Sequence, residues 1–299
     1  MITNKIFHLA IMASFALSAN ATDIKEGLTI WFDRPTTLAN KAIWWGNKPE
    51  KWKDGNKPIS AGDTAQNPDA DWESQSLPLG NGSLGANVMG SIEAERITFN
   101  EKTLWRGGPN TSAGAEAYWN VNKQSAHYLK EIRQAFIEGD EKKAALLTRK
   151  NFNSTVPYES WKEKPFRFGN FTTMGEFYIE TGLSSVGISE YKRALSLDSA
   201  LAVVQFKKDG VRYERNYFIS YPNNIMVVRF KADQPGKQNL VFSYETNPVS
   251  TGKMEADGKN GLVFKAHLDN NQMEYVVRIK ALNQGGTINN DNGKLTING

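Results

Sequence analysis

The sequence predicts a mainly β protein, a large antiparallel β-sandwich (super-sandwich) that carries a short helical hairpin insertion. Short apolar runs alternate with turn clusters of Gly, Asn, Asp and Pro from about residue 166 onward. One segment, residues 126–150, instead repeats its apolar positions with helical spacing. Strands and helices do not follow a βαβ rhythm, so a parallel sheet is not expected. The strand candidates outnumber those of an immunoglobulin domain, which predicts two large sheets packed face to face.

The N-terminus has the pattern of a secretory signal peptide over Met1–Ala21. Lys5 supplies a positive charge, Ile6–Leu17 is an apolar run, and Ala19-Asn20-Ala21 is a small-x-small cleavage signal. The run is too short for a transmembrane helix, and it lacks the amphipathic period of an N-terminal core helix. We therefore expect a mature domain, residues 22–299, that is secreted or periplasmic in a bacterium.

The composition excludes several classes of protein. The chain has no cysteine, so disulfides, thiol catalysis and a lipid-anchored cysteine are excluded. The formal net charge is +4, and Lys and Arg are scattered among the acids without a basic block. Nucleic-acid binding calls for a basic stripe or a known motif, so no nucleic-acid partner is expected. No second long apolar run follows the leader, so no membrane partner is expected either.

The chain also lacks the residue spacing of a metal site. Its three histidines, His8, His127 and His267, are far apart, so no zinc spacing exists. The clusters Asp269–Asn271 and Asn289–Asn292 do not have the spacing of a calcium loop and suit hairpin turns better. We expect neither a metal nor another cofactor.

The domain is predicted to begin with a strand at Leu28–Thr36. Residues 38–68 then form a long polar segment that contains Trp44, Trp45 and Trp52. Long loops in compact domains are often functional. Two roles fit this segment: a lid or rim that presents aromatic faces to a sugar, or a loop held to the sandwich by buried indoles.

The stretch Leu77–Pro109 has a strand, turn, strand pattern. The turns Gly80-Asn81-Gly82 and Gly107-Gly108-Pro109 bracket the apolar runs Leu84–Ile92 and Arg96–Phe99. Asn between two glycines is expected to adopt a left-handed conformation.

Glu93 and Glu95 form a possible carboxylate pair within this stretch. On a strand they would share one face about 7 Å apart, which resembles the spacing in inverting glycosidases. Carboxylates on strands are more often solvent-exposed, so we interpret both as surface residues.

A helical hairpin is predicted after this stretch. The first helix is indicated by positions with helical spacing: Ala126, Leu129, Ile132, Arg133, Phe136 and Ile137. Gly139 should end this helix, and Asp140 should cap a second helix that runs to about Lys150. Ala144, Ala145 and Leu147 are expected to face the first helix.

The rest of the chain is predicted to be strands and turns. Phe177 and Ile179 should share one face, and Lys208-Asp209-Gly210 should form a hairpin turn. The further strand candidates are Tyr191–Leu197, Ala200–Phe206, Val211–Ile219, Ile225–Phe230, Phe242–Thr246, Leu262–Ala266, Met273–Ile279 and Leu295–Ile297.

Two patterns resemble a known family. The first pattern is PLGNG-x-LGA followed by E-x-x-x-x-NE-x-TLW-x-GGP, and the second is YKRALSLDSALAVVQF followed by RYERNYFISYP. Both are similar to the N-terminal domain of glycoside hydrolase family 95. The resemblance runs from about Trp31 to at least Phe230. It implies an α-L-fucosidase or an α-L-galactosidase acting on a fucosylated or L-galactosylated glycan by inverting hydrolysis.

The resemblance places the chemistry outside this chain. In that family the general acid is a glutamate of an α/α barrel that follows the sandwich, and asparagine and aspartate side chains of the barrel hold the water. Nothing in this sequence resembles those residues, so we expect a fragment with no catalytic residue, whose partner is the barrel of the full-length chain.

Four residues remain as substrate-cleft or interdomain candidates: Asn81, Asn100, Glu101 and Trp105. Glu101 either caps backbone amides of its loop or reaches a cleft beside the barrel. Trp105 either staples the turn or forms a wall of that cleft. The turn around Asn81 also occurs in related phosphorylases with the same two domains, which suggests an architectural role.

Two functions of other classes stay open. A stand-alone carbohydrate-binding sandwich would use Trp44, Trp45 or Trp52 and would bind sugar without hydrolysis. A structural or adhesive surface domain would have no affinity for sugar.

Overall fold

The computed structural model describes residues 6–12, 28–36, 70–106, 125–152, 170–247, 250–269, 271–291 and 293–299. Two compact units are present. The first comprises residues 1–104, 172–269 and 273–299, and the second comprises residues 105–171 and 270–272. Trp44, Trp45 and Trp52 lie outside the described residues.

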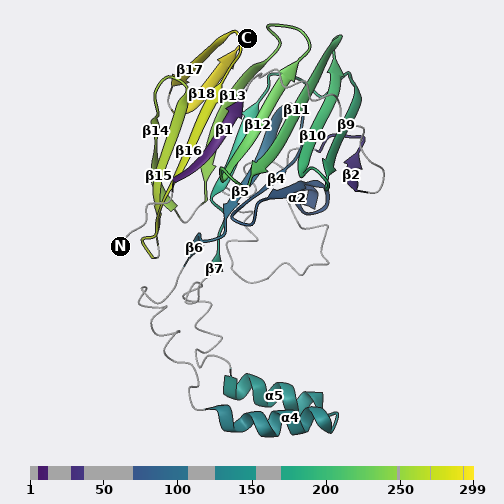
Figure 1. The fold of residues 1–299 in the computed structure, drawn as a ribbon, viewed down its shortest axis with the longest axis vertical. Coiled ribbons are helices and arrows are strands. Elements are labelled where there is room, and N and C mark those ends of the chain that lie inside the picture. Colours follow the sequence, from purple (N-terminus) through teal and green to yellow (C-terminus); the bar gives the residue numbers. More distant parts are fainter. Residues whose placement is uncertain are drawn as a thin grey trace, which may run out of the picture. The chain divides into compact units, whose positions relative to one another are not determined.

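The first unit is a sandwich of two large sheets (Figure 1). The nine-stranded sheet has the order β14 (Ser250–Ala256), β15 (Gly261–Leu268), β16 (Glu274–Leu282), β1 (Ile6–Met12), β12 (Ile225–Ala232), β11 (Val211–Ser220), β10 (Leu201–Lys208), β9 (Ile188–Ser196), β2 (Thr29–Phe32). The seven-stranded sheet has the order β17 (Thr287–Asp291), β18 (Lys294–Asn298), β13 (Asn239–Thr246), β8 (Gly175–Glu180), β5 (Ala94–Glu101), β4 (Leu84–Val88), β3 (Leu77–Gly80). A short helix, α2 (Ala70–Gln75), precedes β3.

The predicted antiparallel sandwich is confirmed. Among the described strands, every pairing is antiparallel except the two pairings of β1, which runs parallel to both β12 and β16. The strand β1 lies within the expected signal peptide. In this structure it occupies the position between β16 and β12 in the nine-stranded sheet.

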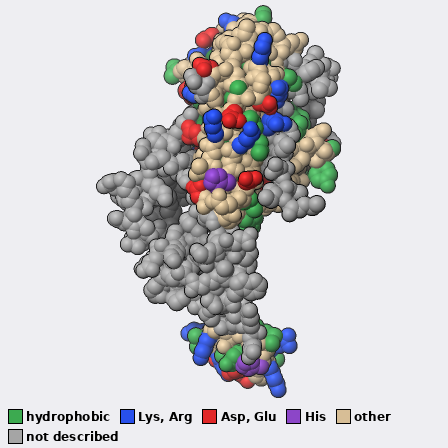
Figure 2. Space-filling model, turned by 90° about the vertical axis from the view of Figure 1, so that its left-hand side faces the viewer, with side chains coloured by type: hydrophobic (Ala, Val, Ile, Leu, Met, Phe, Trp, Pro, Cys, Tyr) green, Lys and Arg blue, Asp and Glu red, His purple; other side chains and the backbone are tan. Residues whose placement is uncertain are grey.

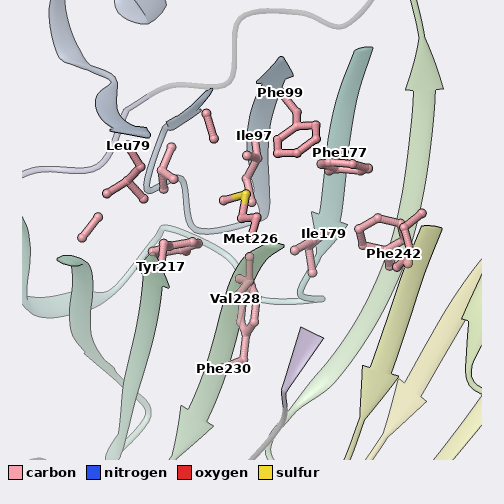
Figure 3. Close-up of a cluster of buried hydrophobic side chains, with 14 of the residues drawn as sticks. Leu79, Ile97, Phe99, Phe177, Ile179, Tyr217, Met226, Val228, Phe230 and Phe242 are labelled. Carbon is pink, nitrogen blue, oxygen red and sulfur yellow. The ribbon is translucent and has the colours of Figure 1, made fainter. Parts of the chain in front are cut away.

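The core lies between the inner faces of the two sheets. Alternate residues of the strands are buried, as the period-2 pattern of β10 and β11 predicts. Figure 3 shows side chains of β5, β8 and β13 meeting those of β11 and β12. The seven-stranded sheet contributes Ile97, Phe99, Phe177, Ile179 and Phe242, and the nine-stranded sheet contributes Tyr217, Met226, Val228 and Phe230. The shared face predicted for Phe177 and Ile179 is therefore confirmed.

The hairpin turns follow the local chemistry of their residues. Asp209 and Gly210 both have positive φ, 49° and 77°, between β10 and β11. Positive φ at both central residues defines the type I′ turn, whose twist matches the flanking strands. The hairpin predicted at Lys208-Asp209-Gly210 is confirmed.

The strands β14 and β17 are among those that were not expected from the sequence. Both are polar and lie at the edges of their sheets. Asn289–Asn292 was expected to be a turn, but Asn289, Asn290 and Asp291 pair with β18. Edge strands face solvent along much of their surface, so they lack the apolar alternation that marks a strand in the sequence.

The second unit contains the helical hairpin. A 3₁₀ turn, η2 (Ser125–Tyr128), leads into α4 (Leu129–Ile137), and α5 (Glu141–Phe152) follows. Gly139 has a φ of 76°, and the Asp140 carboxylate accepts a hydrogen bond of 2.9 Å from the Lys143 amide. The predicted end of one helix and cap of the next are therefore confirmed.

The buried part of this hairpin is small. Ile132, Ala135 and Ala144 are buried, and Leu147 packs against them. The prediction for Ala145 was wrong, because its side chain is exposed. The two short helices bury only one narrow stripe of side chains between them.

Within the described residues, no helix has the length and apolarity needed to cross a membrane. The second unit also holds the short pair β6 (Trp105–Arg106) and β7 (Asn170–Phe171).

Candidate functional site

Asn81 joins the turn between β3 and β4 to the turn between β11 and β12. Its side-chain oxygen accepts hydrogen bonds from the amides of Ser83 (2.9 Å) and Leu84 (2.7 Å). Its side-chain nitrogen donates to the Ser220 carbonyl (3.0 Å) and to Asn224 Oδ1 (2.9 Å). The turns belong to different sheets, so this side chain links the two sheets at this end.

The left-handed conformation expected for Asn81 is wrong. Gly82 has the positive φ, 84°, and Asn81 is not among the described residues with positive φ. The side chain of Asn81 accepts hydrogen bonds two and three residues ahead and so closes the turn itself. The left-handed residue is the next one, where glycine carries no steric cost.

Glu101 caps its own turn. It is buried at the end of β5, and its carboxylate accepts hydrogen bonds from the Thr103 amide (2.8 Å) and the Thr103 hydroxyl. Ser83 also donates to it at 3.4 Å, and the Glu101 amide donates to Asn100 Oδ1 at 2.8 Å. The amide-capping role, one of the two roles expected from the sequence, accounts for these contacts.

Ser83 connects two of the sequence candidates. Its amide donates to Asn81, and its hydroxyl donates to Glu101. Its carbonyl accepts from the Lys102 amide at 3.0 Å. The structure thus gathers Asn81, Ser83 and Glu101 at one end of β3, β4 and β5.

Trp105 belongs to the second unit. It lies on β6 opposite Phe171 of β7, with the ring centroids 5.6 Å apart. Its carbonyl accepts a hydrogen bond of 2.8 Å from Asn271. The indole is 46% exposed. The turn that Trp105 was expected to staple, residues 107–109, lies outside the described residues, so its two expected roles both stay predictions.

Glu93 and Glu95 have different environments, so they do not form an exposed pair. Glu93 is exposed, and its carboxylate accepts hydrogen bonds from the Ser185 amide (2.8 Å) and hydroxyl (2.5 Å). Burial raises the pKa of Glu93, but the bonds from Ser185 outweigh it and hold the pKa below its usual value. Glu95 is fully buried, so the surface position predicted for it is wrong.

Glu95 accepts hydrogen bonds on both of its oxygens. One oxygen accepts from the amides of Met89 (3.1 Å) and Gly90 (2.8 Å). The other accepts from Arg215 Nη1 (3.1 Å) and the Tyr217 hydroxyl (2.6 Å). These four donors replace the water that a buried carboxylate would otherwise need.

The same cluster extends through Arg215 into the loop that joins β4 to β5. The guanidinium of Arg215 also donates to the carbonyls of Ser91 and Ile92. Burial raises the pKa of the Tyr217 hydroxyl well above its usual value, and the neighbouring Glu95 carboxylate raises it further. These groups link β11 to that loop across the space between the sheets. The sequence singled out Glu95 but did not indicate its link to Arg215 and Tyr217.

A second buried ion pair lies on the opposite face of β5. Arg96 donates from Nε to both oxygens of Glu176, each at 3.1 Å, and the Tyr178 hydroxyl also donates to that carboxylate. Ile97 and Phe177 alternate with these residues and face the core, so the pair lies on the outer face of the seven-stranded sheet. Trp72 of α2 donates to Thr98 Oγ1 there at 2.7 Å.

A signal for these clusters does exist in the sequence. Charged residues occur among the apolar residues of β5, at Glu95 and Arg96, and of β11, at Arg215. The pattern does not give their partners, since Glu95 and Arg215 are 120 residues apart. Only the pairing of the sheets reveals which charges meet.

An open depression of about 650 Å³ lies at the β14–β16 edge of the sandwich. Its lining includes Lys253, Lys265, His267, Glu274 and Tyr275. The aromatic residue of this lining, Tyr275, is buried, so it offers a sugar no exposed ring face. Glu274 of β16 lies opposite His267 of β15 in this lining.

The charges near this edge are mixed in sign. Figure 2 shows basic and acidic side chains interspersed on this side of the molecule. Glu255 pairs with Lys265 at 3.1 Å and with Lys253 at 3.5 Å, and Arg278 pairs with Asp257 at 3.3 Å. This face therefore lacks the basic stripe of a nucleic-acid-binding surface. Across the described part of the chain, no cluster of His, Asp and Glu has the geometry to hold a metal ion.

The buried charged groups of β5, β8 and β11 bond to other groups of the protein. Glu95, Arg96, Glu176 and Arg215 are each almost fully buried and bonded to protein groups. A general acid or base must reach the substrate directly or through a water. The carboxylates of Glu95 and Glu176 are instead bonded to groups of the sandwich and its loops.

Comparison with known proteins agrees with this architecture. The profile of the family described as glycosyl hydrolase family 65, N-terminal domain, matches residues 63–299. The chain is 34% identical over 175 residues to the probable alpha-fucosidase A of Aspergillus niger, covering 58% of this chain and 20% of that protein. It is 25% identical over 225 residues to the alpha-L-fucosidase 2 of Arabidopsis thaliana, covering 72% of this chain and 23% of that protein.

The chain spans about a fifth of the length of these relatives. The resemblance to family 95 is consistent with these matches, because the relatives are named as fucosidases and the matching profile describes the N-terminal domain of a glycosyl hydrolase. The family profile covers well over half of the chain and ends at its last residue. The chain therefore belongs to the family of glycosyl hydrolase family 65 N-terminal domains.

Proposed function

We propose that this chain is the N-terminal sandwich of an exported α-L-fucosidase of family 95 type. The full-length enzyme removes terminal α-L-fucose from glycans by inverting hydrolysis. Catalysis resides in an α/α barrel that follows this domain, and the sandwich supports that barrel. The observation that carries the proposal is the similarity to fucosidases over 58% to 72% of this chain.

The internal bonding of the motif supports this division of roles. Asn81 and Glu101 direct their side chains to neighbouring turns, and Glu95 is buried among four donors. None of these groups is left to activate a water or to protonate a leaving group. In this proposal the motif builds the domain, and the acid and the water-holding residues come from the barrel.

The first experiment compares two purified chains, residues 22–299 and the full-length polypeptide. Nitrophenyl α-L-fucoside is the substrate, and released nitrophenol is measured. We expect release by the full-length enzyme and none by residues 22–299. Release by residues 22–299 alone would contradict the absence of catalytic residues from this chain.

Inversion is tested on the same full-length enzyme. Proton NMR during the first minutes of hydrolysis distinguishes the two anomers of the released sugar. An inverting enzyme first releases β-L-fucose, because water attacks from the face opposite the leaving group. First release of the α anomer would show retention.

An α-L-galactosidase is the second candidate function. L-galactose differs from L-fucose by one hydroxyl group at carbon 6, and the pocket for this carbon would lie in the barrel. The ratio of kcat/KM for nitrophenyl α-L-fucoside and nitrophenyl α-L-galactoside decides between them. A site built to hydrogen-bond the extra hydroxyl would favour the galactoside strongly.

Export is proposed from the leader sequence. Cleavage after Ala21 would give an exported protein that begins at Thr22. Mass spectrometry of the N-terminal peptide from the exported protein tests this. A peptide that still contains residues 6–12 would contradict it.

A further inference from the structure

The place of β1 in the nine-stranded sheet conflicts with its expected removal. Residues 6–12 pair with β12 from His8–Met12 and with β16 from Ile6–Met12. Cleavage after Ala21 would take this strand away. The sheet would then divide into a three-strand part, β14–β15–β16, and a five-strand part that begins at β12. We call the space between β12 and β16 the strand slot.

In this structure β12 and β16 are too far apart to pair directly with each other. Adjacent strands lie about 4.8 Å apart, so β12 and β16 are separated by roughly 9.6 Å. Each is held in place on its other side, β12 by β11 and β16 by β15. An empty slot would leave two rows of unpaired backbone groups inside the sheet, which is costly.

The core beneath the slot also requires a cover. Met226, Val228 and Phe230 of β12 are at most 1% exposed. On β16, Val277, Ile279 and Ala281 are buried to the same degree. These six side chains belong to the single large core between the sheets. Removing the strand between them would admit water to that core, with a loss of hydrophobic stabilisation.

The direction of β1 is the exception in the sheet. It runs parallel to both neighbours, whereas the other described pairings are antiparallel. Since β12 and β16 run the same way, an occupant of opposite direction would make the whole sheet antiparallel. Purely antiparallel sheets are favoured over mixed arrangements of this kind.

Gly299 lies at the end of the slot from which such an occupant would enter. Its carbonyl accepts a hydrogen bond of 2.9 Å from the Gln238 amide, in the segment that follows β12. It also lies against Gly286, in the segment that follows β16. Figure 1 places the C-terminus at the same end of the sheet as the arrowhead of β1. A strand that enters there runs antiparallel to β12 and β16.

We propose that the strand slot is an acceptor site which, in the exported protein, holds a strand from the polypeptide beyond Gly299, antiparallel to β12 and β16. Before processing, the leader strand β1 holds the same slot. The occupant has about seven residues, the length of β1, and alternate apolar side chains that enter the core beside the six core residues. This proposal rests on the proposed function, because both require export and a longer polypeptide.

The test is hydrogen exchange at single-residue resolution in the full-length exported protein, with its N-terminus verified by mass spectrometry. Alternate amides of β12 and of β16 face the slot, and the others face β11 or β15. The amides that face β11 or β15 are the internal control, because β11 and β15 are present in every chain that is compared. We expect the slot-facing amides to exchange within about tenfold of the control amides.

The chain of residues 22–299 provides the contrast. With the slot empty, its slot-facing amides should exchange at least about a hundredfold faster than the control amides. If residues 22–299 aggregate while residues 1–299 fold, the slot must be filled for stability, which supports the proposal. In residues 1–299, Leu9→Pro should reproduce the fast exchange, because proline removes an amide from the ladder, while Leu9→Val should not.

Three results would overturn the proposal. One is fast exchange of the slot-facing amides in the exported full-length protein. Another is slow exchange of the same amides in residues 22–299, which would mean that this chain fills or closes the slot itself. The third is an exported protein that retains residues 6–12. Fucose release by the same full-length preparation tests the proposed function separately, so the failure of either idea can be recognised.

Discussion

Glu95 and Arg215 form a fully buried ion pair, with 3.1 Å between Oε2 and Nη1, that joins the seven-stranded sheet to the nine-stranded sheet. Each side chain also bonds to the backbone. Glu95 accepts hydrogen bonds from two backbone amides, and Arg215 donates to two backbone carbonyls. The pair connects strands that are distant in sequence and holds the loop between β4 and β5 in place.

The first prediction concerns this pair. Glu95→Gln should lower the free energy of unfolding by about 3–5 kcal/mol, because it leaves the Arg215 charge buried without a counter-ion. Urea denaturation followed by circular dichroism measures the change. Glu93→Gln, two residues away and exposed, is the matched control and should cost less than about 1 kcal/mol. Equal effects of the two substitutions would contradict the importance of the buried pair.

The second prediction concerns the side chain that joins the turns. Asn81→Ala removes four hydrogen bonds and should cost about 2–4 kcal/mol of stability. Asn283→Ala is a suitable control, because Asn283 donates only locally to the exposed Gly285 carbonyl. Thermal unfolding should separate the two variants by several degrees. A Tm for Asn81→Ala that matches the control would show that the link between the turns is dispensable.

The third prediction contrasts two glycines of the same motif, both with positive φ. At Gly90, φ is 75°, and an added Cβ would lie 2.8 Å from Arg193 Cδ and 2.9 Å from the Tyr191 hydroxyl. At Gly82, φ is 84°, but an added Cβ meets nothing within 4 Å. Gly82→Ala should therefore cost about 1–2 kcal/mol from backbone strain alone. Gly90→Ala should cost about 1–3 kcal/mol more, because the added methyl group would also crowd the side chains of Arg193 and Tyr191. Denaturant midpoints measured side by side decide whether packing adds to strain.

The fourth prediction concerns alkaline pH. Burial raises the pKa of Tyr178, Tyr191, Tyr217 and Tyr244 above the usual value near 10. A raised pKa stabilises the folded state fully below pH 10, and this contribution is lost as the pH rises toward the folded-state pKa. Absorbance at 295 nm should show these tyrosines ionising only when the domain unfolds. In urea, all the tyrosines should titrate together near pH 10. Ionisation of every tyrosine near pH 10 in the folded domain would refute their burial.

The fifth prediction separates the two roles considered for Glu101. Its carboxylate is bonded to Thr103 and Ser83, so Glu101→Gln should leave kcat/KM of the full-length enzyme within about threefold of the parent value. Glu101→Ala should cost about 1–2 kcal/mol of stability through loss of the cap. A loss of kcat/KM by a hundredfold in Glu101→Gln, with unchanged stability, would show that this carboxylate contacts the substrate.

Local sequence chemistry predicted much of this fold. The Asp209-Gly210 turn, the end of a helix at Gly139 and the cap at Asp140 each depend on residues that are neighbours in the chain. The inward alternation of Val211, Tyr213 and Tyr217 likewise follows from the period of a strand. The strands β14 and β17 were missed because their polar residues carry no such period.

The candidate site was only partly predictable. The sequence identified Asn81 and Glu101 as substrate-cleft or interdomain candidates and gave amide capping as one of two roles for Glu101, but it did not indicate the partners of Asn81. Asn81 bonds to Ser220 and Asn224, more than a hundred residues away, and this contact exists only because two sheets pack together. Glu95 was expected at the surface for the same reason, since a single strand does not show what covers it.

The sequence by itself determined the type of most elements, the places of the main turns and the resemblance to a glycoside hydrolase domain, because these depend on short-range backbone preferences and contiguous motifs. Tertiary structure decided the strand order, the burial of Glu95 and Arg215, and the position of residues 6–12 between β12 and β16. The physical reason is that hydrogen bonds between strands and the desolvation of charges depend on which distant segments meet, and that information appears only when the two sheets close over a common core.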